Sequence, residues 1–324
     1  MKVVRDKSGE YSDCGYRYLD FERFDDDSHD AAFFYGYASG RNKHLLERYQ
    51  DYERRIFYQG EQPCGFYSLN DVERRESLAI GDHFDEIYST CPYSAEWMNL
   101  IHGYDKYRPA IFPHNMQWAA GTAEYEKVVD VMYWGNLPNG AADVRHIMET
   151  IPKFKYAFFT LGHGLTPELL SYATGIRVPR TEMWGVLRHT KIMVTSNLLY
   201  LTDAEVESVK QIDRWEENKA FAHLDQKLMP QIKTRPIEAI FNKTLVLLKE
   251  DPWHIFDYWF EPGEDFLYYK NNEDLEEVIS EITTNWEKYQ HIPQNAYNKA
   301  TQLYTTERLY RDIEKGQHEF TFKP

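Results

Sequence analysis

The feature that most constrains the fold is a regular alternation of short apolar runs with stretches of helical periodicity. Residues 31–37 (AAFFYGY) form a continuous apolar run that ends at Ser39-Gly40, as expected of a strand buried on both faces. Further strands are predicted over 55–59, 84–89 and 109–112, and helices over 42–54, 70–80 (capped by Ser68) and 94–102 (ended by Gly103). Strand–helix–strand repeats of this kind predict a parallel α/β sheet.

The alternation lapses between Pro113 and Glu126 and then resumes. Strands are predicted over 128–134, 156–161, 192–195, 244–249 and 266–269, and helices over 142–150, 181–189 (capped by Thr181), 235–241, 273–289 and 293–314. The series predicts two doubly wound α/β domains, 1–120 and 121–324, with a cleft that faces the carboxyl ends of both sheets. The last helix is a candidate to pack back on the first domain, and the charged stretch 204–223 is expected to be a helix on the solvated surface.

Composition narrows the class of protein. The 324 residues are 42% hydrophobic, enough for a sizeable core, and the net charge of −15 disfavours nucleic-acid backbones and anionic membranes. Three scattered cysteines argue against a disulfide framework or a Cys-x-x-Cys zinc site. No apolar run is long enough to cross a bilayer, and the N-terminus lacks the apolar core of a signal peptide, so we expect a cytoplasmic protein without an integral membrane segment.

Several familiar site motifs are absent from the sequence. There is no Gly-x-Gly-x-x-Gly, no P-loop, no Gly-x-Ser-x-Gly and no His-Glu-x-x-His, which excludes the fingerprinted dinucleotide, P-loop, hydrolase-elbow and zincin sites. Asp25-Asp26-Asp27 contains an Asp-x-Asp, but its context is a charged loop before the first clear strand. A solvated acidic loop is favoured there, and no metal site is predicted.

The segment Thr234-Arg235-Pro-Ile-Glu238-Ala239 opens a short helix before an apolar strand. A carboxylate at such a position can accept both hydroxyls of a ribose, while the positive end of the helix faces a diphosphate. Arg235 and Lys191 would add positive charge where a nucleoside diphosphate leaves. The residues alone favour a structural role for both: Glu238 as a carboxylate that offsets the helix dipole, and Arg235 as part of a surface ion pair.

The order of these segments resembles the carboxyl half of the group 1 glycosyltransferases of the GT-B fold. The resemblance covers about residues 127–313. It rests on 129–136 (VDVMYWGN), on Arg235-Pro-Ile-Glu238-Ala239, on the apolar strand 245–248, on 263–269 (GEDFLYY) and on the final helices with Arg308. It implies two Rossmann-like domains that face a central cleft.

The same resemblance implies roles for individual residues. Glu238 would bind the donor ribose, and Lys191, with Arg188, would meet the diphosphate, although Arg188, Lys191 and Arg235 all compete for this role. The resemblance also implies Gly135, Asn136, His163 and Gly164 on the donor side, with Ser39, Gly40 and Arg41 as the nearest substitute for an absent Gly-rich acceptor loop. Trp253 and His254 follow a predicted strand, and this position, not the resemblance, makes them candidates for contact with the donor sugar.

His114 and the pair Asp82-His83 are two further candidate positions. His114, at the joint, either donates a hydrogen bond to the transferred sugar or is a hinge histidine bonded to backbone. Asp82 and His83 precede a strand and therefore lie at the wrong end of a parallel sheet for a site.

The expected function is that of a glycosyltransferase. It would move a sugar from a nucleoside diphosphate sugar to a glycan or other hydroxyl acceptor, without a metal or other cofactor, and the resemblance implies retention of the anomeric configuration. One alternative is a DNA-base glycosyltransferase of the phage kind, which the cations 41, 43, 54, 55, 74 and 75 favour and the net charge disfavours. Another is a non-catalytic, two-lobed protein that binds a sugar or nucleotide.

Overall fold

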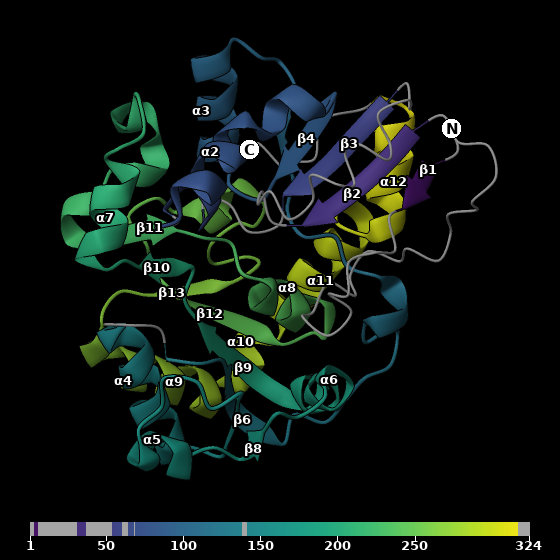
Figure 1. The fold of residues 1–324 in the computed structure, drawn as a ribbon. Coiled ribbons are helices and arrows are strands. Elements are labelled where there is room, and N and C mark those ends of the chain that lie inside the picture. Colours follow the sequence, from purple (N-terminus) through teal and green to yellow (C-terminus); the bar gives the residue numbers. More distant parts are fainter. Residues whose placement is uncertain are drawn as a thin grey trace. The chain divides into compact units, whose positions relative to one another are not determined.

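The computed structural model describes residues 3–5, 31–36, 54–59, 64–67, 69–137 and 141–316. The chain divides into two compact units (Figure 1). Unit 1 comprises 1–113, 201–232 and 309–321, and unit 2 comprises 114–200, 233–308 and 322–324. The predicted helix 42–54 and the cap Ser68 lie outside the described residues, except for Arg54.

Unit 1 contains a parallel sheet whose strands lie in sequence order. The strands are β1 (Val3–Arg5), β2 (Ala31–Gly36), β3 (Arg54–Gln59), β4 (Glu86–Ser89) and β5 (Tyr107–Pro109). The described helices of this unit include α2 (Asp71–Ala79) and α3 (Pro92–His102), and α3 ends at Gly103 in the left-handed conformation that glycine favours. The parallel pairing confirms the α/β class predicted for this half.

The segment 201–232 belongs to the core of unit 1 rather than to a solvated helix. Only α7 (Asp203–Val209) is α-helical in the stretch predicted as one charged helix, and short 3-10 turns and β11 (Leu228–Pro230) follow it. Phe221 is buried edge-on between Phe66 and Trp97, whose indole N–H donates to the Arg214 carbonyl at 3.0 Å. The prediction for this stretch was wrong because its many charges mask a few widely spaced apolar anchors.

Unit 2 contains a six-stranded sheet in the order β13-β12-β9-β6-β7-β8, and all its neighbouring strands are parallel. The strands are β6 (Val129–Trp134), β7 (Tyr156–Thr160), β8 (Gly175–Ile176), β9 (Thr190–Thr195), β12 (Leu245–Lys249) and β13 (Leu267–Tyr269), and β10 (Leu198–Tyr200) lies outside this sheet. From β6 the chain builds outward first through β7 and β8 and then, on the other side, through β9 and β12. The carboxyl end of β6 is therefore the switch point at which open α/β sheets bind ligands.

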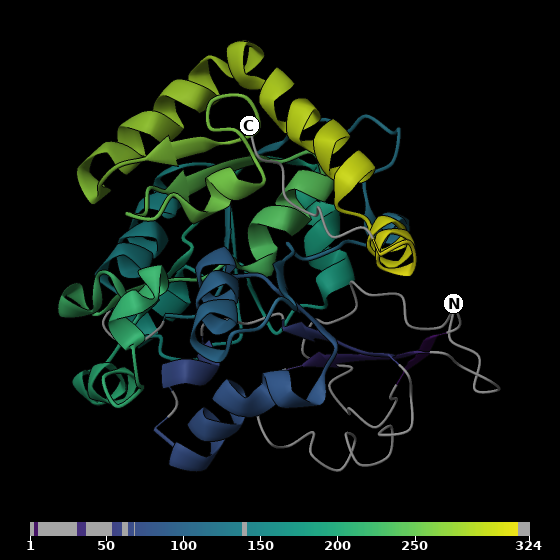
Figure 2. The ribbon, with the colours of Figure 1, turned by 90° about the horizontal axis from the view of Figure 1, so that it is seen from above.

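One face of this sheet packs on α4 (Ala142–Thr150) and α9 (Asn272–Thr284), which lie side by side in Figure 1. Alternate strand residues such as Val131, Ile192 and Leu245 enter that core. Strands β9 and β12 also contact α6 (Arg180–Arg188), α8 (Thr234–Phe241) and α11 (His291–Leu303). The helices α9, α10 (Trp286–Tyr289) and α11 follow one another as a bent series, drawn in yellow-green to yellow in Figure 2.

Most predicted elements of unit 2 are found, with shifts at their ends. The helix over 142–150 has the predicted bounds, but Thr181 lies inside α6 and caps nothing, because the helix already begins after Pro179. The predicted helices 273–289 and 293–314 are each interrupted, at Asn285 and at Tyr304-Thr305, where α12 (Thr306–Glu314) begins. In unit 1, the strand predicted over 109–112 is found at 107–109.

Within the ranges that the structure describes, none of the helices is both long enough and apolar enough to cross a bilayer.

Residues 309–321 group with unit 1, and the Arg54 guanidinium donates to the Ile313 carbonyl at 3.0 Å.

Candidate functional site

The candidate site of unit 2 begins at the carboxyl end of β6, where Tyr133 and Trp134 are followed by Gly135. A side chain on Gly135 would meet the Nη1 atom of Arg235 and the Tyr133 hydroxyl, both 2.6 Å from an ideal Cβ position. Arg235, in the first turn of α8, therefore reaches the switch point only because residue 135 is glycine. The guanidinium also lies 6.0 Å from the centre of the Tyr133 ring.

Glu238 lies one turn further along α8 and is fully buried. Its Oε1 atom accepts a hydrogen bond from Arg180 Nη1 at 3.0 Å, whereas its buried Oε2 atom has no hydrogen-bond partner among the described residues. Burial raises the pKa of Glu238 well above its usual value, because desolvation disfavours the charged form. A buried oxygen that lacks a partner is costly and marks a position where a ligand can supply one.

Arg180 is the first residue of α6, and the topology explains its position. In a parallel sheet the helix that precedes a strand runs against it, so α6 and α8 both begin at the carboxyl edge. The Arg180 guanidinium also lies over the Trp134 ring, 4.8 Å from its centre. Two helix starts and one strand end thus bring Arg180, Arg235 and Glu238 together.

Lys233, immediately before α8, adds a third basic side chain. Its Nζ atom donates to the Leu198 carbonyl at 2.9 Å, and its backbone N–H donates to Asn197 Oδ1 at 3.2 Å. Burial, together with the neighbouring charge of Arg235, lowers the pKa of Lys233 well below its usual value. The first turn of α8, which follows Lys233 and contains Arg235, has no side-chain cap.

The loops that follow β6 and β7 form the adjoining part of the same edge. Asn136 Oδ1 accepts from the Thr160 hydroxyl at 3.0 Å and from the Leu161 N–H at 3.1 Å, which ties the two strand ends together. Gly164 has a φ of +74°, and a Cβ there would clash with the Leu137 carbonyl. His163 is exposed in this turn, so the structure places all four predicted donor-side residues at the carboxyl edge, with Asn136 in a bracing role.

Lys191 and Arg188 lie at the opposite edge. Lys191 stands at the start of β9 and pairs with Asp130, at the start of β6, at 2.8 Å. Arg188 ends α6, where it donates to Asn242 Oδ1 at 3.0 Å and to the Trp118 carbonyl at 3.2 Å. These positions correct the expectation that both face a diphosphate, because the ligand-binding edge of a parallel sheet is the carboxyl one.

His114 is buried within unit 2, with its ring 4.4 Å from that of Phe241. Its backbone N–H donates to the Tyr304 carbonyl at 2.9 Å, and its own carbonyl accepts from the Thr306 N–H at 3.1 Å. Burial and the charge of Arg180 lower the pKa of His114 to about 3, so the ring is neutral at physiological pH. These bonds come from the backbone of His114 and not from its ring, so the two predicted roles of the ring both stay predictions.

The loop after β12 contains the other predicted sugar-contacting residues. Trp253 is 9% exposed and packs into the core, whereas His254 is half exposed. The His254 ring lies 3.4 Å from an Asp257 oxygen and 3.7 Å from a Glu250 oxygen. Ser39, Gly40 and Arg41, predicted on the acceptor side, lie outside the described residues.

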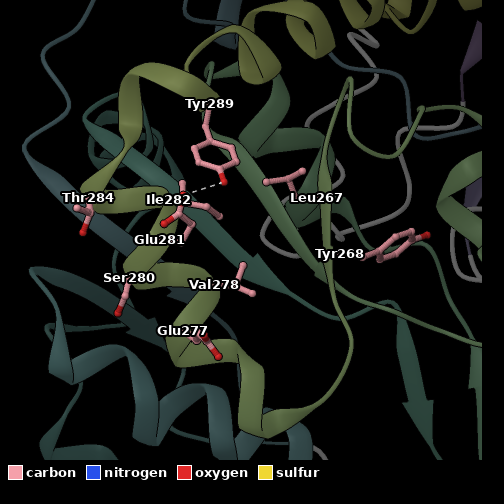
Figure 3. A pocket seen from close by; sticks show the side chains of 9 residues that line it. All are labelled: Leu267, Tyr268, Glu277, Val278, Ser280, Glu281, Ile282, Thr284 and Tyr289. Carbon is pink, nitrogen blue, oxygen red and sulfur yellow. Dashed lines mark hydrogen bonds between the residues drawn. The ribbon is translucent and has the colours of Figure 1, made fainter.

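A separate open hollow of about 640 Å³ lies beside β13 and α9 (Figure 3). Its lining includes Glu277, Glu281 and Tyr289, whose hydroxyl donates to Glu281 at 3.4 Å. The two carboxylates would repel a diphosphate, so this hollow does not compete with the β6 edge as an anion site. In the described part of the chain, no three His, Cys, Asp or Glu side chains are grouped closely enough to hold a metal ion.

Known proteins provide an independent comparison. A family described as "Glycosyl transferase-like" matches residues 145–315, more than half of the chain. No curated protein sequence matches significantly.

Among solved structures, HepE of Anabaena in complex with UDP is 10% identical, with a TM-score of 0.59 over 98% of this chain and 99% of that one. Sucrose-phosphate synthase of Thermosynechococcus elongatus is 13% identical, with a TM-score of 0.56 over 89% of this chain and 74% of that one. TarM is 11% identical, with a TM-score of 0.53 over 88% of this chain, which spans 54% of TarM. The structural similarities confirm the fold, and the family match covers more than half of the chain. The chain therefore has the GT-B fold and belongs to the glycosyl transferase-like family.

Proposed function

We propose that this protein is a glycosyltransferase that binds a nucleoside diphosphate sugar at the carboxyl edge of unit 2. The observation that supports this most directly is the buried Oε2 atom of Glu238, which has no partner among the described residues and lies in a cluster that also holds Arg180 and Arg235. A carboxylate suits a ribose hydroxyl, and the cations suit a diphosphate. The complexes of HepE with UDP and with UDP-glucose favour a uridine nucleotide as the first donor to test.

The reaction would be a displacement at the anomeric carbon. The bond from that carbon to the diphosphate oxygen breaks, and the nucleoside diphosphate leaves with the electron pair. The acceptor oxygen bonds to the carbon, and its proton goes to an oxygen of the leaving diphosphate. Arg235 and the uncapped N–H groups of α8 would stabilise the charge that develops on the leaving group. An anion beside Lys233 would also favour the protonated form of that amine.

The finer parts of the proposal concern the metal, the stereochemistry and the acceptor. Since cations of the chain can neutralise the diphosphate, we propose a reaction that does not depend on a divalent metal. We propose retention of the anomeric configuration, which the resemblance to group 1 glycosyltransferases implies. We propose a glycan or another hydroxyl compound as the acceptor.

The test is the affinity for UDP-glucose measured by calorimetry on the whole chain, with and without EDTA. Glu238→Gln keeps the volume but replaces an acceptor oxygen by an amide, so we expect the Kd to rise by about 100-fold, the equivalent of about 2.7 kcal/mol. Glu168→Gln, an exposed carboxylate on α5 (Pro167–Ser171), is the matched control and should leave the Kd unchanged.

Unchanged affinity in Glu238→Gln, with a folded protein, would refute the placement of the site. A Kd that EDTA raises would refute the metal-independent reaction. Tight binding without release of UDP, in the presence of a panel of glycan acceptors, would instead indicate the non-catalytic binding protein.

A further inference from the structure

We propose that Arg180 is a positioning residue, which holds Glu238 as a carboxylate with one oxygen engaged and the other left for the ligand. This inference rests on the proposed function for the identity of that ligand. It adds a residue from α6 that no local motif around Glu238 indicates, because the two are 58 positions apart in the sequence.

The geometry restricts the guanidinium on two sides. Arg180 donates to Glu238 Oε1 at 3.0 Å, and its guanidinium lies 4.8 Å from the centre of the Trp134 ring. Stacking on an aromatic face fixes the plane of a guanidinium and adds a favourable interaction with the ring. Because Oε1 is occupied by Arg180, the carboxylate presents Oε2.

The surroundings supply no other cation in contact with this carboxylate among the described residues. The elements packed against α8 are α6, α11, β9, β12 and the segment around His114. The basic side chains of these elements and of α8 contact other groups: Lys191 pairs with Asp130, Arg188 with Asn242, Lys249 with the Lys270 carbonyl, Lys299 with Asp265, Arg235 with Tyr133, and Lys233 with the Leu198 carbonyl. The His114 ring is neutral, and the side chains of His291 and Glu182 are exposed.

Two opposing effects therefore set the charge of Glu238. Burial raises its pKa. The guanidinium that donates to Oε1 at 3.0 Å acts in the opposite direction, because an opposite charge stabilises the ionised form. An opposite charge at this distance typically lowers a carboxyl pKa by about 1–3 units relative to the same site without it. Removal of Arg180 should then favour the protonated form of Glu238, a hydrogen-bond donor where the ligand needs an acceptor.

The first measurement needs no ligand. Unfolding free energies of the wild type and Glu238→Gln are compared from about pH 5 to about pH 9, and the same comparison is made in the Arg180→Met background. A carboxyl whose folded pKa is raised stabilises the protein at low pH, and this contribution is lost as the pH rises through the folded pKa. The pH at which the difference becomes constant should move up by about 1–3 units in Arg180→Met.

The second measurement is the Kd for UDP-glucose over the same range, since its pyrophosphate has no ionisation there. In Arg180→Met, affinity should be at least tenfold weaker at neutral pH and should recover as the pH rises, while Arg180→Lys, which keeps the charge, should restore much of the wild-type profile. An unshifted stability profile, or a loss of affinity that is equal at every pH, would overturn the proposal. A shifted stability profile in a protein that binds no nucleotide would leave the role of Arg180 standing and refute the proposed donor site.

Discussion

The two edges of the unit 2 sheet contain similar residues but use them differently. At the amino edge, Lys191 is paired with Asp130, and Lys127 donates to two backbone carbonyls, those of Arg188 at 2.9 Å and Lys243 at 2.7 Å. At the carboxyl edge, Glu238 keeps one buried oxygen without a partner in the described structure. Charge alone therefore does not mark the site in this unit; a buried carboxylate that pairs with a guanidinium through one oxygen and leaves the other unsatisfied does.

The comparison has a thermodynamic consequence. Satisfied groups at the amino edge should contribute to stability and leave donor binding unaffected when they are changed. Changes to groups at the carboxyl edge should weaken donor binding and leave stability almost unaffected, because an incompletely satisfied site gives up stability for function. Variants at each edge therefore test whether the two edges differ in this way.

The largest effect is expected from Lys127→Met at the amino edge. The ammonium group binds the carbonyl that ends α6 and another just after α8, so its loss leaves both without their charged donor. We expect a loss of about 3 kcal/mol in the free energy of unfolding, measured in urea, and an unchanged Kd for UDP-glucose. Lys153→Met, which removes an exposed ion pair with Glu276, should cost less than about 1 kcal/mol.

The same lysine gives a pH test with a defined sign. Burial and the nearby charge of Lys243 lower the pKa of Lys127 to about 7, below its value in the unfolded chain. Between about pH 7 and about pH 10 the unfolded chain holds more protons, so the stability of the wild type relative to Lys127→Met should rise with pH. A difference that is constant or falls across this range would contradict the burial of this amine.

An intermediate effect, on binding rather than stability, is expected from Gly135→Ala. The added methyl would meet the Arg235 guanidinium and the Tyr133 hydroxyl, so the guanidinium must move away from the end of β6. We expect about a tenfold higher Kd for UDP-glucose, or about 1.4 kcal/mol. Gly185→Ala is the matched control: nothing lies within 4 Å of its Cβ position in the middle of α6, so it should add about 0.5–1 kcal/mol of stability and leave the Kd unchanged. Equal Kd values in the two variants would remove Arg235 from the site.

The sequence predicts the fold well where periodicity is strong and one face of an element is buried. The helix over 142–150 and the parallel strands of both units follow from apolar spacing alone. In the stretch 201–232 this signal is missing, because Phe221 reaches the core of unit 1 from a short 3-10 turn that has no period. Long-range packing of irregular chain leaves no repeating pattern to detect.

The site is predicted in part, for a similar reason. Glu238, Arg235 and Gly135 lie in local motifs, and the structure places these motifs at the carboxyl edge, while their roles stay predictions. The rule that excludes Asp82 and His83 also excludes Lys191, which directly precedes the strand predicted over 192–195 and is the second residue of β9. Arg180 has no local motif, and only the pairing of the starts of α6 and α8 reveals it.

The smallest effect, and the strictest test of the two edges, is expected from Lys191→Met. The Lys191–Asp130 pair is about one-fifth to one-quarter exposed, at 19% and 27% of the two side chains, so its loss should cost about 1 kcal/mol and the double variant with Asp130→Asn should recover part of it. The Kd for UDP-glucose should not change. If instead it rises tenfold with stability intact, Lys191 contributes to donor binding from the wrong edge of the sheet, and satisfied pairing no longer separates structural charges from functional ones.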